Sequence, residues 1–249
     1  MLVGDRVLLI VGGSRGISEA LCVRFRKSGY SLVVLSRQKP EFDVAKHFYL
    51  DIDDLSIVSA AFNQLKEFLK DRDCKHISTH FVTGGSLKIS DNSPCSEISK
   101  YKMITWHNLG FPYWATQFII NNVSCNEEVD WLYNYYSSAV IRNFSSHPLY
   151  SASKAGLESM FKSLVNTAGN KQYFFCFRLG MVGVKHKFFY ELSKADPSKF
   201  QTILDKNVPS GFFTTPESLA DLVYSMHEHK SICHGMISDI SGGNSWIEK

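Results

Sequence analysis

The sequence predicts an α/β fold, a single-domain doubly wound parallel sheet of about seven strands with helices on both faces. Short apolar runs alternate with helical patterns of a dozen or more residues along the chain, as parallel strands joined by helical crossovers require. The first run, 6–11, is apolar almost throughout, which is typical of a strand buried on both faces. It leads into a glycine-rich loop, and no linker or repeat interrupts the 249 residues.

The same patterns place the individual elements. Strands are expected at 6–11, 31–35, 47–51, 77–82, 129–137, 172–178 and 235–240. Helices are expected between them, at about 16–28, 55–70, 97–122, 150–168 and 216–228. In a doubly wound sheet, ligands bind at the carboxyl ends of the strands, where the strand order reverses. Motifs at strand ends therefore carry the functional argument.

Composition narrows the classes of partner. The net charge is +3, and the lysines and arginines are spread along the chain, which argues against nucleic acid. The six cysteines form no CxxC pair, so we expect no metal site and reduced thiols of a cytoplasmic protein. The apolar run near the N-terminus is too short for a membrane span and lacks the features of a signal peptide. We expect no membrane partner.

A glycine loop follows the first strand and opens a helix. Its residues are Gly12, Gly13, Ser14, Arg15, Gly16 and Ile17. Glycines let the backbone turn tightly and approach a pyrophosphate, whose charge a helix N-terminus stabilises. Alone, such a loop is as easily a plain turn. Its place after the first buried strand favours nucleotide binding.

The charges near this loop favour one cofactor. Strands that bind NAD(H) usually have an acid at the end of the second strand, to hold the ribose 2′-hydroxyl. Here that end carries Arg37, and Arg15 lies in the glycine loop. Guanidinium groups suit a 2′-phosphate, so we expect NADP(H). The alternative is that both are ordinary surface arginines.

Two Tyr-x-x-x-Lys pairs occur, Tyr150/Lys154 and Tyr190/Lys194, and such a pair arises readily by chance. Tyr150 opens a predicted helix, so that it shares a helix face with Lys154. The strand before it ends in Ser137-Ser138, whereas Tyr190 has no serine partner. A nearby ammonium should lower the phenol's pKa from about 10 and make Tyr150 an acid–base group. A serine hydroxyl should stabilise a developing oxyanion.

These motifs resemble those of the short-chain dehydrogenases/reductases, namely TGxxxGxG after the first strand and YxxxK after a serine-ended strand. Gly12 and Gly16 match the first two glycines, while Val11 and Ser18 stand in place of the threonine and the third glycine. Along the family pattern, Ser138, Tyr150, Lys154 and Asn108 are the implied catalytic residues. The family usually uses its second serine, which favours Ser138 over Ser137.

The resemblance also implies cofactor contacts. Asp51 and Ile52 match the pair that contacts adenine, and Gly84 and Gly85 match the end of the fourth strand, where Val82 and Thr83 replace two asparagines. Val182 matches a backbone contact to the carboxamide of nicotinamide, although Leu179 and Val184 replace the usual proline and threonine. The implied cofactor-binding residues are Gly12, Ser14, Arg15, Gly16, Ile17, Arg37, Asp51, Ile52, Gly84, Gly85, Tyr150, Lys154 and Val182.

The resemblance covers the chain and implies one Rossmann-type NADP(H)-binding domain over residues 1–249, with a substrate lid at about 185–213. It implies hydride transfer between NADP(H) and a carbonyl or secondary alcohol, with Tyr150 as acid/base, in a dimer or tetramer. One alternative is a catalytically impaired NADP(H)-binding sensor or scaffold, which the altered cofactor loops favour and the retained Tyr–Lys pair opposes. Another is a nucleotide-sugar epimerase or dehydratase, for whose usual substrate domain the chain leaves little room.

Overall fold

The chain forms one all-parallel sheet of seven strands in the order β3-β2-β1-β4-β5-β6-β7. The computed structural model describes residues 4–70, 72–84, 94–124, 128–138, 148–185 and 188–243. The predicted fold class is confirmed, and each predicted strand is present. The strands are β1 (Arg6–Val11), β2 (Ser31–Ser36), β3 (Lys46–Tyr49), β4 (His76–Phe81), β5 (Asp130–Ser138), β6 (Gln172–Leu179) and β7 (Ile237–Ile240).

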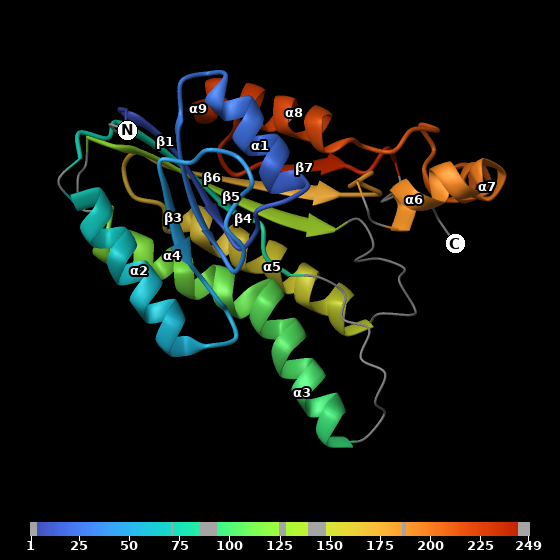
Figure 1. Cartoon of the computed structure of the whole chain (residues 1–249), viewed down its shortest axis with the longest axis horizontal. Coiled ribbons are helices and arrows are strands. Elements are labelled where there is room, and N and C mark those ends of the chain that lie inside the picture. The colour runs from blue at the N-terminus through green and yellow to red at the C-terminus, as the bar shows by residue number, and fades with distance from the viewer. Residues whose placement is uncertain are drawn as a thin grey trace.

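Helices cover both faces of the sheet (Figure 1). One face carries α1 (Ile17–Arg26) and α8 (Pro216–Glu228), and the other carries α2 (Leu55–Lys70), α4 (Phe111–Asn122) and α5 (Pro148–Asn166). The remaining helices are α3 (Pro94–Thr105), α6 (Phe188–Ala195), α7 (Pro197–Asn207) and α9 (Lys230–Cys233). No helix among the described residues is long and apolar enough to cross a membrane.

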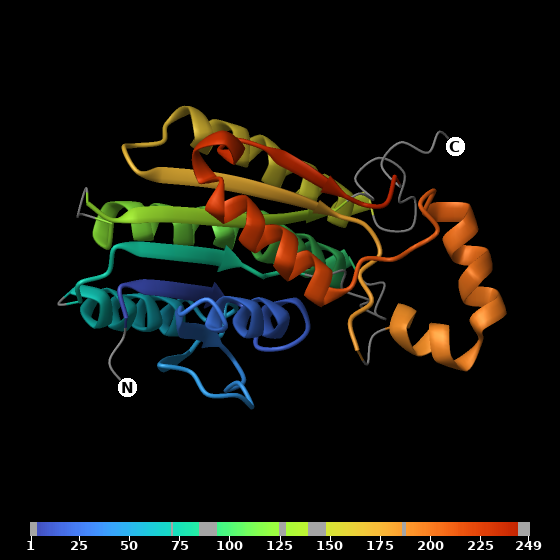
Figure 2. The ribbon, with the colours of Figure 1, turned by 90° about the horizontal axis from the view of Figure 1, so that it is seen from above.

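The order of the strands reverses beside β1. Val11, the last residue of β1, pairs with Leu35 of β2 on one side and with Phe81 of β4 on the other. The loops that leave β1 and β4 therefore separate at this point, as in other doubly wound sheets. All seven strands point the same way, and α6 and α7 lie beyond their carboxyl ends (Figure 2).

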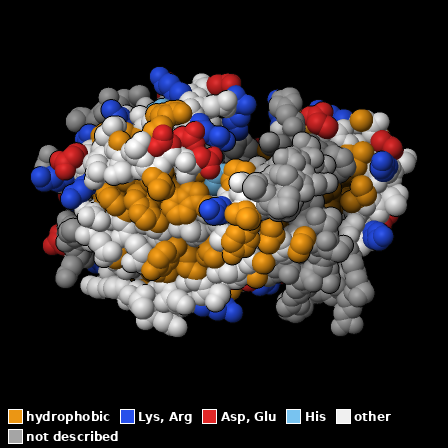
Figure 3. Space-filling view, turned by 90° about the horizontal axis from the view of Figure 1, so that it is seen from below, with side chains coloured by type: hydrophobic (Ala, Val, Ile, Leu, Met, Phe, Trp, Pro, Cys, Tyr) orange, Lys and Arg blue, Asp and Glu red, His pale blue; other side chains and the backbone are white. Residues whose placement is uncertain are grey.

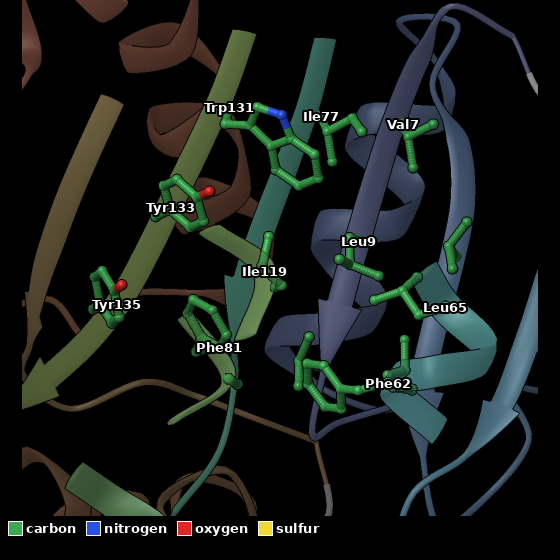
Figure 4. Packing of buried hydrophobic residues seen from close by; sticks show 14 of the residues in the cluster. Val7, Leu9, Phe62, Leu65, Ile77, Phe81, Ile119, Trp131, Tyr133 and Tyr135 are labelled. Atoms are coloured by element: carbon green, nitrogen blue, oxygen red, sulfur yellow. The ribbon is translucent and has the colours of Figure 1, made fainter. Parts of the chain in front are cut away.

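Each face of the sheet has its own apolar core. On the α2–α4–α5 side, side chains from β1, β4 and β5 meet Phe62 and Leu65 of α2 and Ile119 of α4 (Figure 4). On the other side, Leu21 and Phe25 of α1 pack with the sheet and α8. Strands buried on both faces cannot alternate apolar and polar residues, which is why they appear as continuous apolar runs.

One stretch differs from the expectation, and another contains helices that the sequence did not place. The helix predicted over 97–122 is divided by a five-residue π-helical turn, η1 (Trp106–Gly110), between α3 and α4. Such turns shift the side chains that follow and are frequent at functional sites. The stretch expected to form a lid contains α6 and α7, and α7 begins at Asp196, whose side chain accepts a hydrogen bond from the Lys199 N–H.

Candidate active site

The carboxyl ends of the central strands gather the predicted site residues. The glycine loop follows β1, Gly84 follows β4, Ser138 ends β5, and Val182 follows β6. Tyr150 and Lys154 come from the first two turns of α5, which packs beside β5 and β6. Gly85 lies outside the described residues. Parallel strands thus bring together residues that are far apart in the sequence.

Lys154 is the most constrained charged side chain of the site. It is 5 % exposed, and its Nζ donates a hydrogen bond to the Tyr136 carbonyl oxygen at 2.9 Å. Burial lowers the pKa of this ammonium from 10.5 to about 8. Nζ lies 5.9 Å from the centre of the Tyr150 ring, so the pair shares one side of α5. A backbone oxygen therefore fixes the lysine beside the tyrosine.

The side chain of Ser138 lies close to the hydroxyl of Tyr150. Burial raises the pKa of Tyr150 above 10, and the interaction with Ser138 acts against that rise. We expected Lys154 to lower this pKa, but its Nζ is directed to the Tyr136 carbonyl oxygen instead. In this state Tyr150 is a neutral phenol at pH 7, as a proton donor must be.

The neighbouring serine is turned elsewhere. Ser137 Oγ donates to the Lys154 carbonyl oxygen of α5 at 3.3 Å, and its side chain is buried. Ser137 therefore ties the strand to the helix, while Ser138 faces Tyr150. This arrangement favours Ser138 as the serine that contacts a substrate.

Asn108 stands in η1 and is completely buried. Its Nδ2 donates to the Ile104 carbonyl oxygen at 2.9 Å, whereas Oδ1 has no hydrogen-bond partner among the described residues. A Cβ added to Gly84, which has φ +94°, would collide with this Oδ1 and lie 3.5 Å from Lys154 Nζ. The unpaired amide oxygen and the ammonium therefore face the same point, beside a residue without a side chain.

The glycine loop provides a cradle for a phosphate group. Gly12 has φ +103°, and a Cβ there would collide with the Thr83 methyl group. Gly16 has φ +61°, and a Cβ there would lie 2.7 Å from Val184. Gly16 precedes the first turn of α1 and has no side-chain cap, so the N–H groups of that turn have no side chain to bind. These residues fit a dinucleotide pyrophosphate.

Ser18, which stands where the family pattern has its third glycine, places a hydroxyl beside this loop. The hydroxyl of Ser18 is buried and has no hydrogen-bond partner among the described residues. It lies next to Gly13, where an added Cβ would approach it to 2.5 Å. The hydroxyl thus fills space between α1 and the glycine loop without satisfying its own bonding capacity.

The two predicted phosphate-binding arginines are solvent-exposed. Arg15 lies 3.8 Å from Glu41 in an exposed ion pair, and Arg37 follows the end of β2. Arg15 lines a cleft of about 980 Å³ that extends from the glycine loop to Lys39 and to Tyr190 of α6. Both arginines are therefore accessible at the ribose end of the predicted cofactor site, and Arg15 shares the cleft with the carboxylate of Glu41.

The residues predicted to contact adenine and nicotinamide lie in turns of the backbone. Asp51 Oδ1 accepts the Asp53 N–H at 3.2 Å, and Ile52 packs partly against the core. Beyond β6, Val182 forms a short parallel bridge with Thr214. The bonds of this bridge use Met181 and Gly183, which leaves the Val182 N–H facing the other way.

Tyr190 and Lys194 contact each other, and Tyr190 lines the cleft that begins at the glycine loop. Both lie on α6, and Lys194 Nζ is 4.5 Å from the centre of the Tyr190 ring. Lys194 is exposed, and its contact with Tyr190 raises the pKa of this ammonium, the reverse of the shift at Lys154.

Comparison with known proteins extends these observations. No family model matches the sequence. L-xylulose reductase of Caenorhabditis elegans is 23% identical over 97% of this chain and 96% of its own. Ligand-free aldohexose dehydrogenase of Thermoplasma acidophilum superposes with a TM-score of 0.78 at 18% identity, over 100% of this chain and 98% of its own. A short-chain dehydrogenase/reductase of Burkholderia thailandensis gives 0.75 at 19% identity, over 98% and 94%. The full-length sequence match and the shared fold agree with the motifs at the strand ends, and in both respects the chain is similar to short-chain dehydrogenases/reductases.

Proposed function

We propose that this chain is an oxidoreductase that transfers a hydride between NADP(H) and a carbonyl compound or secondary alcohol. One observation carries the proposal: the partly buried phenol of Tyr150 lies close to the side chain of Ser138, and the buried ammonium of Lys154 accompanies it on the same helix. A protein that only binds the cofactor needs no such group.

The nicotinamide ring, when bound, supplies or accepts the hydride. Tyr150 donates its proton to the carbonyl oxygen during reduction and removes it from the alcohol in the reverse reaction. Ser138 donates a hydrogen bond to the same oxygen as negative charge develops there. Lys154 holds an ammonium 5.9 Å from the centre of the Tyr150 ring, and this charge favours the phenolate at the moment when the proton is transferred.

Asn108 and Lys154 form the route by which Tyr150 recovers its proton. The Oδ1 of Asn108, which has no partner in the described part of the chain, and the Nζ of Lys154 face the space beside Gly84. A buried acceptor without a partner is costly, and an ordered water in a polar space removes that cost. We propose a water there, linking Asn108 to Lys154.

The cofactor is held by groups at four points. The first turn of α1 and the glycine loop, with Ser14, Gly16 and Ile17, bind the pyrophosphate, and Val182 offers its backbone N–H to the carboxamide. Asp51 and Ile52 contact adenine. Arg15 and Arg37 bind the 2′-phosphate and so select NADP(H) over NAD(H). Lys39, which the sequence did not single out, lines the same cleft as Arg15.

Self-association accompanies the proposed activity. The α2–α4–α5 side of the molecule shows gathered hydrophobic side chains (Figure 3). Ile98 and Tyr101 of α3 and Tyr113 of α4 are exposed to solvent. These helices adjoin Asn108, so we propose a dimer or tetramer that covers this face.

We also propose that the protein works in the cytoplasm, because the free thiols of Cys22, Cys74, Cys176 and Cys233 suit that compartment.

The test combines a binding and a turnover measurement on the wild-type protein. NADPH and NADH are titrated by fluorescence, and NADPH oxidation is then followed across ketones, ketoses including L-xylulose, and diketones. We expect NADPH to bind about tenfold more tightly than NADH, a preference that the Arg15→Glu/Arg37→Glu variant abolishes. Tight NADPH binding without turnover on any carbonyl compound would support the sensor alternative instead.

A further inference from the structure

Two consecutive side chains of η1 extend to the turn after β3. Trp106 Nε1 donates to the Ile52 carbonyl oxygen at 2.6 Å. His107 Nε2 lies 2.6 Å from Asp53 Oδ1, and because a carboxylate oxygen accepts, the imidazole donates. Asp53 also donates its backbone N–H to Asp51 Oδ1. These bonds join the π-helical turn to residues 51–53.

The next residue of η1 is Asn108, whose amide must face Lys154 in the proposed proton route. Its side chain has one described bond, from Nδ2 to the Ile104 carbonyl oxygen. A π-helical turn departs from the regular hydrogen-bond ladder of the helices on either side, so side-chain contacts weigh more in fixing its shape. Trp106 and His107 supply such contacts directly before Asn108.

Residues 51–53 also form one end of the proposed cofactor site, because Asp51 and Ile52 are assigned to adenine. The same short turn would thus contact the cofactor on one side and η1 on the other. The His107 side chain is 15% exposed and that of Asp53 is 47% exposed, so solvent screens their bond only in part.

We propose that Trp106 and His107 are positioning residues that couple occupation of the adenine end of the site to the placement of Asn108 beside Lys154. The proposal rests on the proposed function, since it uses that assignment of Asp51, Ile52 and Asn108. Neither residue contacts the reacting atoms. Adenine binding orders the turn at 51–53, and the two bonds hold η1 in the shape that directs Asn108 Oδ1 toward Lys154.

The experiment uses His107→Val, which removes the donor, and His107→Gln, whose amide retains an N–H of similar reach. Binding of 2′,5′-ADP is measured by calorimetry, with 5′-AMP alongside in case the enzyme prefers NAD(H). The kcat is measured at saturating NADPH. The control is His76→Val, because His76 forms a pair with Asp130 at 3.9 Å at the amino ends of the strands.

We expect His107→Val to weaken 2′,5′-ADP binding about fivefold and to lower kcat about tenfold, with most of both restored in His107→Gln. Adding His107→Val to Asn108→Ala should lower kcat by no more than about twofold further, because His107 acts through Asn108. The His76→Val control should leave both quantities unchanged.

Unchanged nucleotide binding and kcat in His107→Val, with only a lower melting temperature, would reduce the contact to a structural brace and overturn the proposal. Independent, multiplicative losses in the double variant would do the same. The binding measurement needs no turnover. A wild-type protein that reduces nothing would therefore defeat the proposed reaction, while weaker 2′,5′-ADP binding in His107→Val would still support a link between η1 and the adenine turn.

Discussion

The two halves of the candidate site hold their chemistry by different means. In the half built by β5, α5 and η1, the functional groups belong to side chains. Buried hydrogen bonds to backbone carbonyl oxygens hold Lys154, Ser137 and Asn108 in place. In the half built by the glycine loop and α1, the working groups are backbone N–H groups and a path that only glycine follows easily, with φ +103° at Gly12.

This difference explains where the chain departs from the pattern of the short-chain dehydrogenases/reductases that it resembles. The altered positions include Val11, Ser18, Val82 and Thr83, all around the glycine loop, where a new side chain leaves the backbone groups in place. The half that depends on side chains keeps its tyrosine, lysine, serine and asparagine. We infer that the cradle tolerates substitutions that the catalytic half does not.

The adjacent serines give the largest expected contrast. Ser138→Ala should lower kcat about a hundredfold, because it removes a hydrogen bond to the developing oxyanion. Ser137→Ala should lower kcat by no more than about threefold, since it loses one bond between strand and helix. Steady-state kinetics at saturating NADPH measures both. Equal losses would show that the two hydroxyls are not divided between chemistry and structure.

The pKa of Lys154 predicts that kcat/KM depends on pH, with an effect smaller than that of Ser138→Ala. Because burial lowers this pKa to about 8, the lysine is an ammonium below that pH and neutral above it. The kcat/KM for carbonyl reduction, which reports the free enzyme, should therefore fall about tenfold between pH 7 and pH 9. Lys154→Arg keeps its charge and should lose this limb of the profile. A flat wild-type profile across this range would mean that the lysine's charge is not needed.

Gly12→Ala tests whether the backbone conformation of the glycine loop determines the affinity for NADPH. The added methyl group would collide with Thr83, and φ +103° strains any residue with a Cβ. Strain of about 1.4 kcal/mol corresponds to a tenfold rise in the dissociation constant of NADPH, with kcat at saturation changed by no more than about threefold. Gly12→Ala/Thr83→Ser should recover part of the affinity. A loss confined to kcat would contradict this division of the site.

Ser18→Gly should have the smallest effect, although it restores the family's third glycine. Removing a buried hydroxyl without a partner stabilises the fold, while glycine in a helix destabilises it by about 1 kcal/mol, and the two nearly cancel. Urea unfolding should therefore change little, and NADPH affinity should stay within about twofold. A large loss of affinity would instead mean that this hydroxyl contacts the cofactor.

Much of the fold follows from the sequence because strands buried on both faces leave a plain signal. The predicted strand Arg6–Val11 has the same bounds as β1. The ends of the other predicted strands lie within two residues of the observed ends. The turn η1 left no comparable signal, because its apolar residues continue the helical pattern on both sides. The sequence did not predict α6 and α7 as two helices, because the aromatic residues in this stretch are compatible with helix, strand or loop.

The site likewise contains residues that the sequence identified and contacts that it could not predict. The spacing of motifs pointed to Ser138, Tyr150, Lys154 and Asn108, and the structure brings these four together. The bond from Lys154 to the Tyr136 carbonyl oxygen could not be predicted, since every residue has a carbonyl. The buried bond between His80 Nδ1 and the Tyr136 hydroxyl, at 2.8 Å, likewise depends on two strands meeting in register.

The most direct test of the division between side-chain chemistry and a backbone cradle is a single variant, Tyr150→Phe, in which NADPH affinity and kcat are measured on the same preparation. The account predicts that kcat falls about a thousandfold, because general acid–base catalysis is lost, while the dissociation constant of NADPH stays within about twofold of the wild type. Turnover within about threefold of the wild type would contradict it.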